Sequence, residues 1–137
     1  MFMPLRCDQT PPWPLLQAHY ADRGRHLDMR RAFEQDADRF AHFSQSAPHV
    51  FADLSKNLWD RDSEALLLDL ARATGLEAHR NAMFAGEAIN TTENRAVLHT
   101  LLRRPANVAL PGDVPETAQR LADVHSTLNA MLAFAEE

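Results

Sequence analysis

Seven histidines carry most of the metal-binding and proton-transfer potential of this sequence, and their spacing does not assemble a metal site. His42 and His49 lie seven positions apart, but Pro48 between them interrupts any helix that would bring them to one face. The sequence holds no His-Glu-x-x-His pattern, and Cys7 is its only cysteine. We therefore expect no metal site and no internal disulfide.

Two pairs of carboxylates and one histidine are the remaining candidates for acid–base chemistry. Asp36/Asp38 and Asp60/Asp62 each stand near the start of an expected helix, where capping of backbone amides is their more common role. His99 could be a ligand or a base, although a hydrogen-bonded core histidine is the more common outcome on a buried helix. No glycine-rich phosphate loop and no Gly-x-Ser-x-Gly nucleophile elbow occurs. We expect no catalytic and no cofactor-binding residue.

The composition is that of an ordinary soluble globular protein. Of the 137 residues, 45% are hydrophobic and 24% are charged, and the formal net charge is −5. The 14 basic residues do not form the concentrated positive stripe that nucleic acid binding requires. No apolar run approaches the roughly 18–20 residues of a membrane span, and no signal peptide is evident. We expect a cytoplasmic protein that binds neither nucleic acid nor membrane.

The elements that would position these residues are mostly α-helical. Prolines predict an irregular N-terminus over 1–12, and residues 105–115 are expected to form a loop. At most one short strand is expected, near 50–55, where alternation of apolar and polar residues competes with helix. Capping residues and terminal glycines bound the expected helices. Single helices are expected over 13–22, 60–75 and 76–84, and two short helices that join near Asp36 are expected within 26–45. One more helix is expected between the capping residues 91–94 and Pro105, and a long C-terminal helix is expected over 116–136.

Two of the expected helices carry prominent apolar surfaces. Leu66, Leu67, Leu68 and Leu70 cover more than one face of the 60–75 helix, which predicts burial inside a larger assembly of elements. An apolar stripe on the last helix either closes the core of this chain or docks on another domain or a second subunit, so a homo-oligomer is left open. The stripe comprises Ala118, Leu121, Val124, Leu128, Met131, Leu132 and Ala135.

One block of sequence resembles a known family. Residues 82–104 read Ala-Met-Phe-Ala-Gly-Glu-Ala-Ile-Asn-Thr-Thr-Glu-Asn-Arg-Ala-Val-Leu-His-Thr-Leu-Leu-Arg-Arg. The block is similar to the glucose-6-phosphate isomerase signature M-F-x-G-E-K-I-N-x-T-E-x-R-A-V-L-H-x-A-L-R. It departs from that signature at Ala88, in place of lysine, and at Leu101, in place of alanine. We interpret the signature residues as structural: Gly86, Glu87, Asn90, Thr92, Glu93, Arg95 and His99.

The resemblance extends over nearly the whole chain. Asp53-Leu-Ser-Lys-Asn is similar to the family's Asp-Tyr/Phe-Ser-Lys-Asn, and the leucine-rich stretch 64–72 lies where the family has a leucine-rich helix. Residues 13–137 therefore resemble the N-terminal helical segment of a larger α/β sugar-phosphate isomerase. The enzymes of the family are several-fold longer.

The resemblance implies an enzymatic activity whose catalytic residues lie outside this chain. Glucose-6-phosphate isomerases interconvert glucose 6-phosphate and fructose 6-phosphate in glycolysis and gluconeogenesis through an enediol, without a metal or organic cofactor. In the family the catalytic glutamate, histidine and lysine, and the hydroxyls that bind the phosphate, lie beyond the region matched here. We therefore expect this chain to be scaffold, to meet sugar phosphate only through the absent domains, and to be inactive alone. The alternative is a free-standing helical binding module that self-associates or docks on a full-length isomerase.

Overall fold

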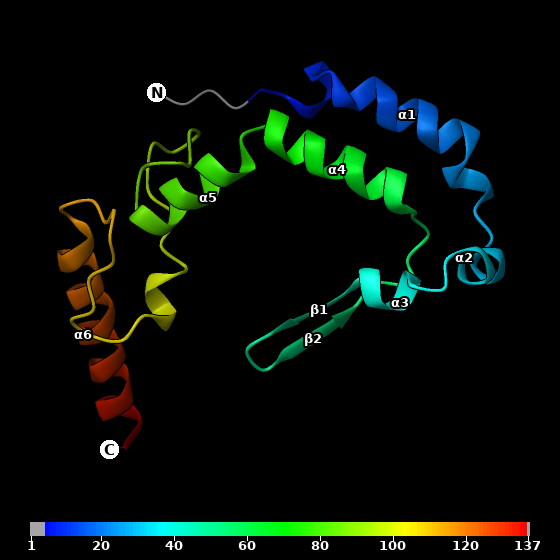
Figure 1. Ribbon diagram of the computed structural model, residues 1–137. Helices are drawn as coiled ribbons and strands as arrows, with labels where there is room; N and C mark the ends of the chain where they lie inside the picture. Colours follow the sequence, from blue (N-terminus) through cyan, green and yellow to red (C-terminus); the bar gives the residue numbers. More distant parts are fainter. Residues whose placement is uncertain (1–4, 137) are drawn as a thin grey trace. The chain divides into compact units, whose positions relative to one another are not determined.

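A computed structural model describes residues 5–136, and the chain divides into two compact units, Met1–Gly75 and Leu76–Glu137. The fold is mostly α-helical, as predicted (Figure 1). Unit 1 contains the 3₁₀ helix η1 (Cys7–Gln9), α1 (Pro12–Asp22), η2 (Gly24–His26), α2 (Met29–Gln35), α3 (Arg39–His42), β1 (Ser44–Ala47), β2 (Val50–Asp53) and α4 (Arg61–Ala73). Unit 2 contains α5 (Leu76–Ala85), η3 (Leu101–Arg103) and α6 (Thr117–Glu136).

Helices α1 and α4 lie side by side and run in opposite directions in unit 1 (Figure 1). Prolines occupy the first turn of α1, where a missing amide hydrogen is not needed, and this confirms the helix predicted over 13–22. Helix α4 begins with a capping box, in which the Asp60 carboxylate accepts from the Ser63 amide and the Ser63 side chain lies at the Asp60 amide. Both helices therefore start where sequence-level signals place them.

Helices α2 and α3 confirm the expectation of two short helices joined near Asp36. The carboxylate of Asp28 caps α2 by accepting from the amide of Arg31 at 3.0 Å. The backbone of Asp36 is extended and ends α2, and its carboxylate accepts from the amide of Asp38 at 3.2 Å. This Asx turn reorients the chain before α3 begins at Arg39.

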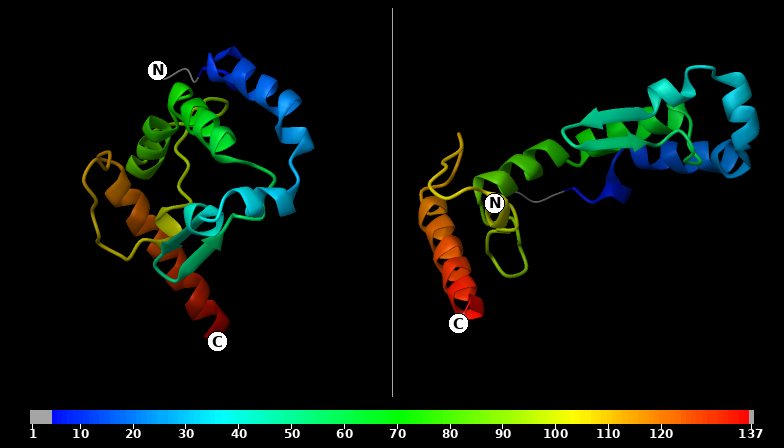
Figure 2. Two further views of the ribbon diagram at one scale, coloured as in Figure 1. Left: turned by 45° about the vertical axis from the view of Figure 1, so that its right-hand side comes forward. Right: turned by 90° about the horizontal axis from the view of Figure 1, so that it is seen from below.

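A β-hairpin replaces the single strand predicted near 50–55. Strand β1 pairs antiparallel with β2, with Ser44 opposite Asp53 and Ala47 opposite Val50. The count of at most one strand was wrong because a strand needs a partner for its backbone groups, and the polar segment Ser44–Ala47 supplies it without an alternating apolar pattern. No other strand in the described part of unit 1 pairs with either edge of this hairpin. The hairpin therefore extends from the end of α3 as a separate arm (Figures 1 and 2).

The small core of unit 1 gathers around α3. Phe43 is 2% exposed, and its ring stacks on that of Trp59 with centroids 5.6 Å apart. Phe40, three residues earlier, is exposed and contacts Phe51 of the hairpin instead. The two phenylalanines are three positions apart and yet lie in different surroundings, because α3 is only one turn long.

Unit 2 begins with α5, which ends at Ala85, immediately before Gly86 and close to the predicted end of this helix. The helix predicted between residues 91–94 and Pro105 was wrong. Residues 91–94 form a turn, an isolated β-bridge joins Asn90 to Arg95, and the only helical turn before Pro105 is η3. The predicted loop over 105–115 and the long final helix are confirmed.

Much of the apolar surface of both units is not covered by the described residues. In unit 2, Leu101 and Leu121 are buried, whereas the second half of the α6 stripe is exposed from Leu128 onward. In unit 1, Leu67 and Leu68 of α4 are exposed, so the prediction of burial on several sides is not met within this chain. Leu66 and Leu70 of α4 are half-buried, so both helices leave much of their apolar surface outside their units.

Candidate functional site

The signature residues of unit 2 form the candidate site, and Gly86 is the first of them in the sequence. Its φ of +85° is unfavourable for any residue with a side chain, and a Cβ atom would lie 2.7 Å from Thr117 Oγ1. The space is needed because Thr117 Oγ1 donates to Ala85 O at 3.1 Å and Arg120 Nη1 donates to Gly86 O at 2.9 Å. Gly86 therefore allows the start of α6 to pack against the end of α5.

A closed set of hydrogen bonds joins Asn90, Glu93 and Arg95. The Asn90 side-chain oxygen accepts from the amides of Thr92 and Glu93 at 3.2 Å each, and its amide nitrogen donates to Glu93 Oε2 at 3.0 Å. Arg95 Nε lies 2.5 Å from the same Glu93 oxygen. Asn94, with φ of 50°, turns the chain so that Asn90 and Arg95 exchange backbone hydrogen bonds. These contacts hold a turn, in which Asn90, Glu93 and the Nε of Arg95 are directed at one another.

The other signature residues lie on the surface of the same unit. Glu87, Thr92 and His99 are exposed. His99 was predicted to be a core histidine on a helix, and this prediction was wrong because the segment around it is a turn rather than a helix. His99 has no serine, cysteine or carboxylate partner among residues 5–136.

The first carboxylate pair, Asp36/Asp38, belongs to an ion-pair network in unit 1. Asp36 accepts from Arg61 Nε and Nη2 at 2.9 Å each, and this bidentate pair holds the pKa of the Asp36 carboxyl below its usual value. Arg61 Nη1 also lies 3.1 Å from His42 Nδ1, while His42 Nε2 lies 2.5 Å from Glu64. The network ties the start of α4 to the segments around α2 and α3.

The second pair, Asp60/Asp62, lies beside a histidine that is distant in sequence. One potential ligand atom each from His19, Asp60 and Asp62 lie within 4.8 Å of one another, which is a spacing that a metal ion could bridge. Each group already has a protein partner, however. His19 Nε2 lies 3.0 Å from both Asp60 Oδ1 and Ser63 Oγ, and Asp62 accepts from Arg23 at 2.9 Å.

These contacts account for the cluster as a helix cap and ion pairs. Burial raises the pKa of the Asp60 carboxyl, but hydrogen bonds from the Ser63 hydroxyl and amide, together with the nearby His19, outweigh burial and lower it. Ser63 and Asp60 both meet the same nitrogen of His19, so the three do not form the nucleophile–base–orienting acid order of a hydrolase. The expected capping role of Asp60 is confirmed.

Sequence reasoning missed two buried arginines that organise the units. Arg39 is 2% exposed and donates to three backbone carbonyls, those of Ser55, Asn57 and Trp59, at 2.7–2.9 Å. Its guanidinium carbon lies 4.9 Å from the centre of the Phe43 ring. Because its partners are main-chain atoms, no pair of side chains in the sequence indicates this contact.

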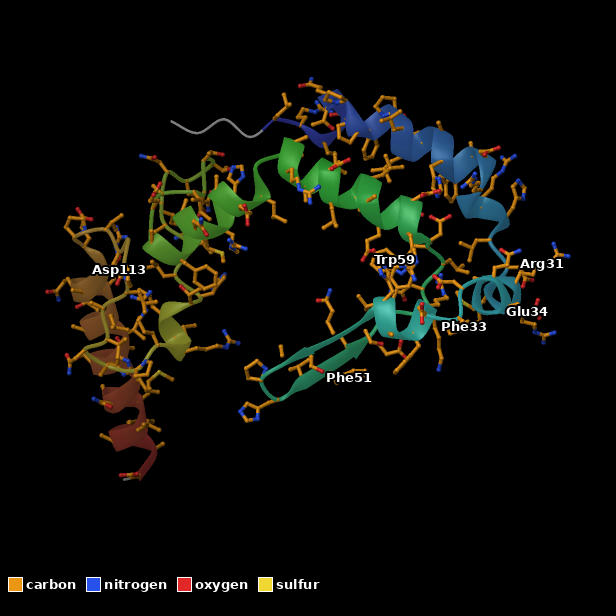
Figure 3. The ribbon with its side chains drawn as sticks, viewed as in Figure 1. Arg31, Phe33, Glu34, Phe51, Trp59 and Asp113 are labelled. Carbon is orange, nitrogen blue, oxygen red and sulfur yellow. The ribbon has the colours of Figure 1, made fainter. Side chains whose placement is uncertain are left out.

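Arg104 is the buried arginine of unit 2. Its Nη1 donates to Asp113 at 2.7 Å, and His125 Nε2 lies 2.9 Å from its carbonyl oxygen. The Leu110 amide and the Arg104 guanidinium together lower the pKa of the Asp113 carboxyl. Asp113, labelled in Figure 3, also accepts from the Leu110 amide at 2.9 Å, so the ion pair holds the 105–115 loop against Arg104, and the His125 contact joins Arg104 to α6.

The contacts of both units define a helical scaffold in which the signature residues mainly bond to one another and to the main chain. Comparison with known proteins identifies the scaffold. Residues 53–137 match the family described as phosphoglucose isomerase. The chain belongs to this family, as the resemblance implied.

Curated relatives match almost the entire chain. It is 62% identical to a glucose-6-phosphate isomerase of Albidiferax ferrireducens and 59% identical to one of Polaromonas naphthalenivorans, over 97% of its length in both cases. A glucose-6-phosphate isomerase of Rhodococcus opacus is 46% identical over 93% of the chain. The chain spans 26% of the length of the first two relatives. No helix among residues 5–136 is long and apolar enough to cross a membrane.

Proposed function

We propose that this chain is the N-terminal portion of a glucose-6-phosphate isomerase and serves as scaffold in that enzyme. The carrying observation is the closed turn of Asn90, Glu93 and Arg95, whose hydrogen bonds are made among signature residues. A group that moves a proton on a substrate must instead face an open reaction site. The high identity to isomerases over only a quarter of their length supports the same interpretation.

The proposal treats residues 13–137 as one segment of the enzyme, preceded by residues 1–12, and places sugar-phosphate binding in domains outside this sequence. It includes a cytoplasmic location, because a charged sugar phosphate does not cross the apolar layer of a membrane and its isomerase must meet it inside the cell. It assigns no metal, organic cofactor or nucleic acid to the segment.

A complementation experiment tests the proposal. The purified chain is mixed with an Albidiferax ferrireducens isomerase from which the matching segment has been deleted, and conversion of fructose 6-phosphate is followed with a coupled dehydrogenase. We expect no turnover by the chain alone, little by the truncated relative, and recovery in the mixture. Turnover by the chain alone, once host isomerase is removed genetically, would refute the scaffold role.

A second candidate function, a self-associating helical module, is favoured by the exposed second half of α6. Leu128, Met131, Leu132 and Phe134 are 44%, 65%, 53% and 80% exposed, which is unusual for one continuous helix of a monomer. Sedimentation across concentration tests this function, with Leu132→Glu as the variant and Ala122→Glu as a charge-matched control nearer the start of the helix. A dimer that Leu132→Glu dissociates and Ala122→Glu retains supports the module, and a monomer at all concentrations excludes it.

A further inference from the structure

A hollow beside the signature turn collects positive charge. Its volume is about 570 Å³, it is open to solvent, and it is lined by residues between Ala88 and Leu102 and by Arg120 and Val124 of α6. Arg95, Arg120 and His99 line it, and no carboxylate does. The concentration of basic groups stands against a net charge of −5 for the whole chain. We call this feature the Arg95–Arg120 hollow.

The Arg120 guanidinium is held in place with most of its donors unused. Within residues 5–136 its single side-chain hydrogen bond runs from Nη1 to Gly86 O at 2.9 Å. A guanidinium carries five N–H donors, and the edge formed by Nε and Nη2 is the one that binds an oxyanion through two parallel hydrogen bonds. Anchoring by Gly86 restricts the side chain before a ligand arrives, which lowers the entropy lost on binding.

Arg95 and Asn94 add donors from the turn. The Nε of Arg95 pairs with Glu93, which partly neutralises its charge, and its two terminal nitrogens have no hydrogen bond within the described chain. Glu93 is itself held by Asn90 Nδ2 and does not line the hollow. Asn94 lines the hollow with a side-chain amide that has no described partner. The polar groups presented to the hollow are therefore mainly donors.

We propose that the Arg95–Arg120 hollow binds a phosphate-type dianion, with the two guanidinium groups as its principal ligands. Such an anion supplies acceptors in three directions and two negative charges, which matches two arginines that each keep at least two donors unused. A monocarboxylate brings half the charge and fewer acceptors. A cation is disfavoured because no carboxylate faces the hollow.

The test is a titration of the full chain with inorganic phosphate at constant ionic strength, followed by the arginine Nε–H and backbone amide signals in nitrogen-edited NMR. We expect saturable shifts at Asn94, Arg95 and Arg120, with a dissociation constant on the order of millimolar, and at least fivefold weaker binding of acetate. Arg95→Gln and Arg120→Gln are each expected to weaken phosphate binding at least fivefold. Arg103→Gln, which removes an exposed arginine outside the hollow, is the matched control.

A gain-of-charge pair makes the test independent of whether Arg120→Gln folds, since Arg120 also supports Gly86. Ala88 lines the hollow and Ala78 on α5 does not. Ala88→Lys is expected to tighten phosphate binding severalfold, whereas Ala78→Lys changes it less than twofold. Shifts that stay linear to 50 mM phosphate, or equal effects of the hollow and control substitutions, would overturn the proposal.

Discussion

Replacing Arg39 by methionine keeps an unbranched side chain in place and removes the charge that donates to the carbonyls of Ser55, Asn57 and Trp59. These carbonyls accept at 2.7, 2.9 and 2.8 Å, and the arginine is 2% exposed. In the variant the carbonyl of the buried Ser55 would be left without this donor. We therefore expect unit 1 to be strongly destabilised.

The magnitude follows from the number and kind of hydrogen bonds. A hydrogen bond to a charged group contributes about 1.5–3 kcal/mol net, so three of them bound the loss at about 4.5–9 kcal/mol. Water can reach the carbonyl of Asn57, an exposed residue, and methionine needs no desolvation, so we expect a net loss of about 3–5 kcal/mol. Arg39→Lys keeps the charge without the planar fork and is expected to cost about 2–3 kcal/mol.

The free energy of unfolding is measured by urea titration of the full chain. Fluorescence reports on this unit because Trp59 stacks on Phe43, beside the arginine. Arg30→Met on α2 is the control, since Arg30 is exposed and its side chain has no described partner; its expected effect is below about 0.5 kcal/mol. If Arg39→Met and Arg30→Met agreed within about 1 kcal/mol, the organising role of Arg39 would be rejected.

Three further predictions concern the caps and turns. Gly86→Ala should destabilise unit 2 by about 2–4 kcal/mol in thermal unfolding, because the added Cβ atom would lie 2.7 Å from Thr117 Oγ1. Gly112→Ala, at a similar φ but in open space, should cost about 1 kcal/mol. Equal costs would contradict the steric argument. Asp60→Ala should cost about 1–2 kcal/mol and reduce helicity measured by circular dichroism, and an unchanged melting temperature would exclude a capping role. The pKa of Asp36 is lowered on folding, so the contribution of its carboxylate to stability is present above the unfolded pKa near 3.8 and is lost as the pH falls through the lowered pKa. The urea midpoint of unfolding should therefore decrease below about pH 4, and Asp36→Asn should make that decrease smaller.

The sequence predicted helices well where a cap and a stop are both local. Asp60 and Ser63 begin α4, and Gly86 follows α5, so these boundaries depend on residues a few positions apart. The segment after Gly86 was mispredicted for a related reason. Asparagine, threonine and glutamate cap helices and also close turns, and here the Asn90 side chain takes the amides of Thr92 and Glu93 for a turn.

The contacts that hold each unit together could not be derived in the same way. His19 meets Ser63 across 44 positions, and Arg39 meets main-chain oxygens 16 to 20 positions away. A lone histidine and a lone arginine carry no sign of such partners, because tertiary packing alone brings them together. The positive hollow was missed because Arg120 belongs to α6, whereas the other basic groups belong to the turn segment.

The distribution of apolar surface connects the scaffold role to stability. Among the described residues the buried hydrophobic side chains are Phe43, Leu101 and Leu121. Complete burial of one further leucine or methionine contributes about 1.5–3 kcal/mol, so covering the exposed part of the α6 stripe would add several kcal/mol to a unit that buries little on its own. Burial of the exposed apolar faces would thus supply stabilising free energy that the small core of each unit does not provide. A segment with this distribution gains its full stability by packing against a larger body, which is the relation between scaffold and enzyme that we propose.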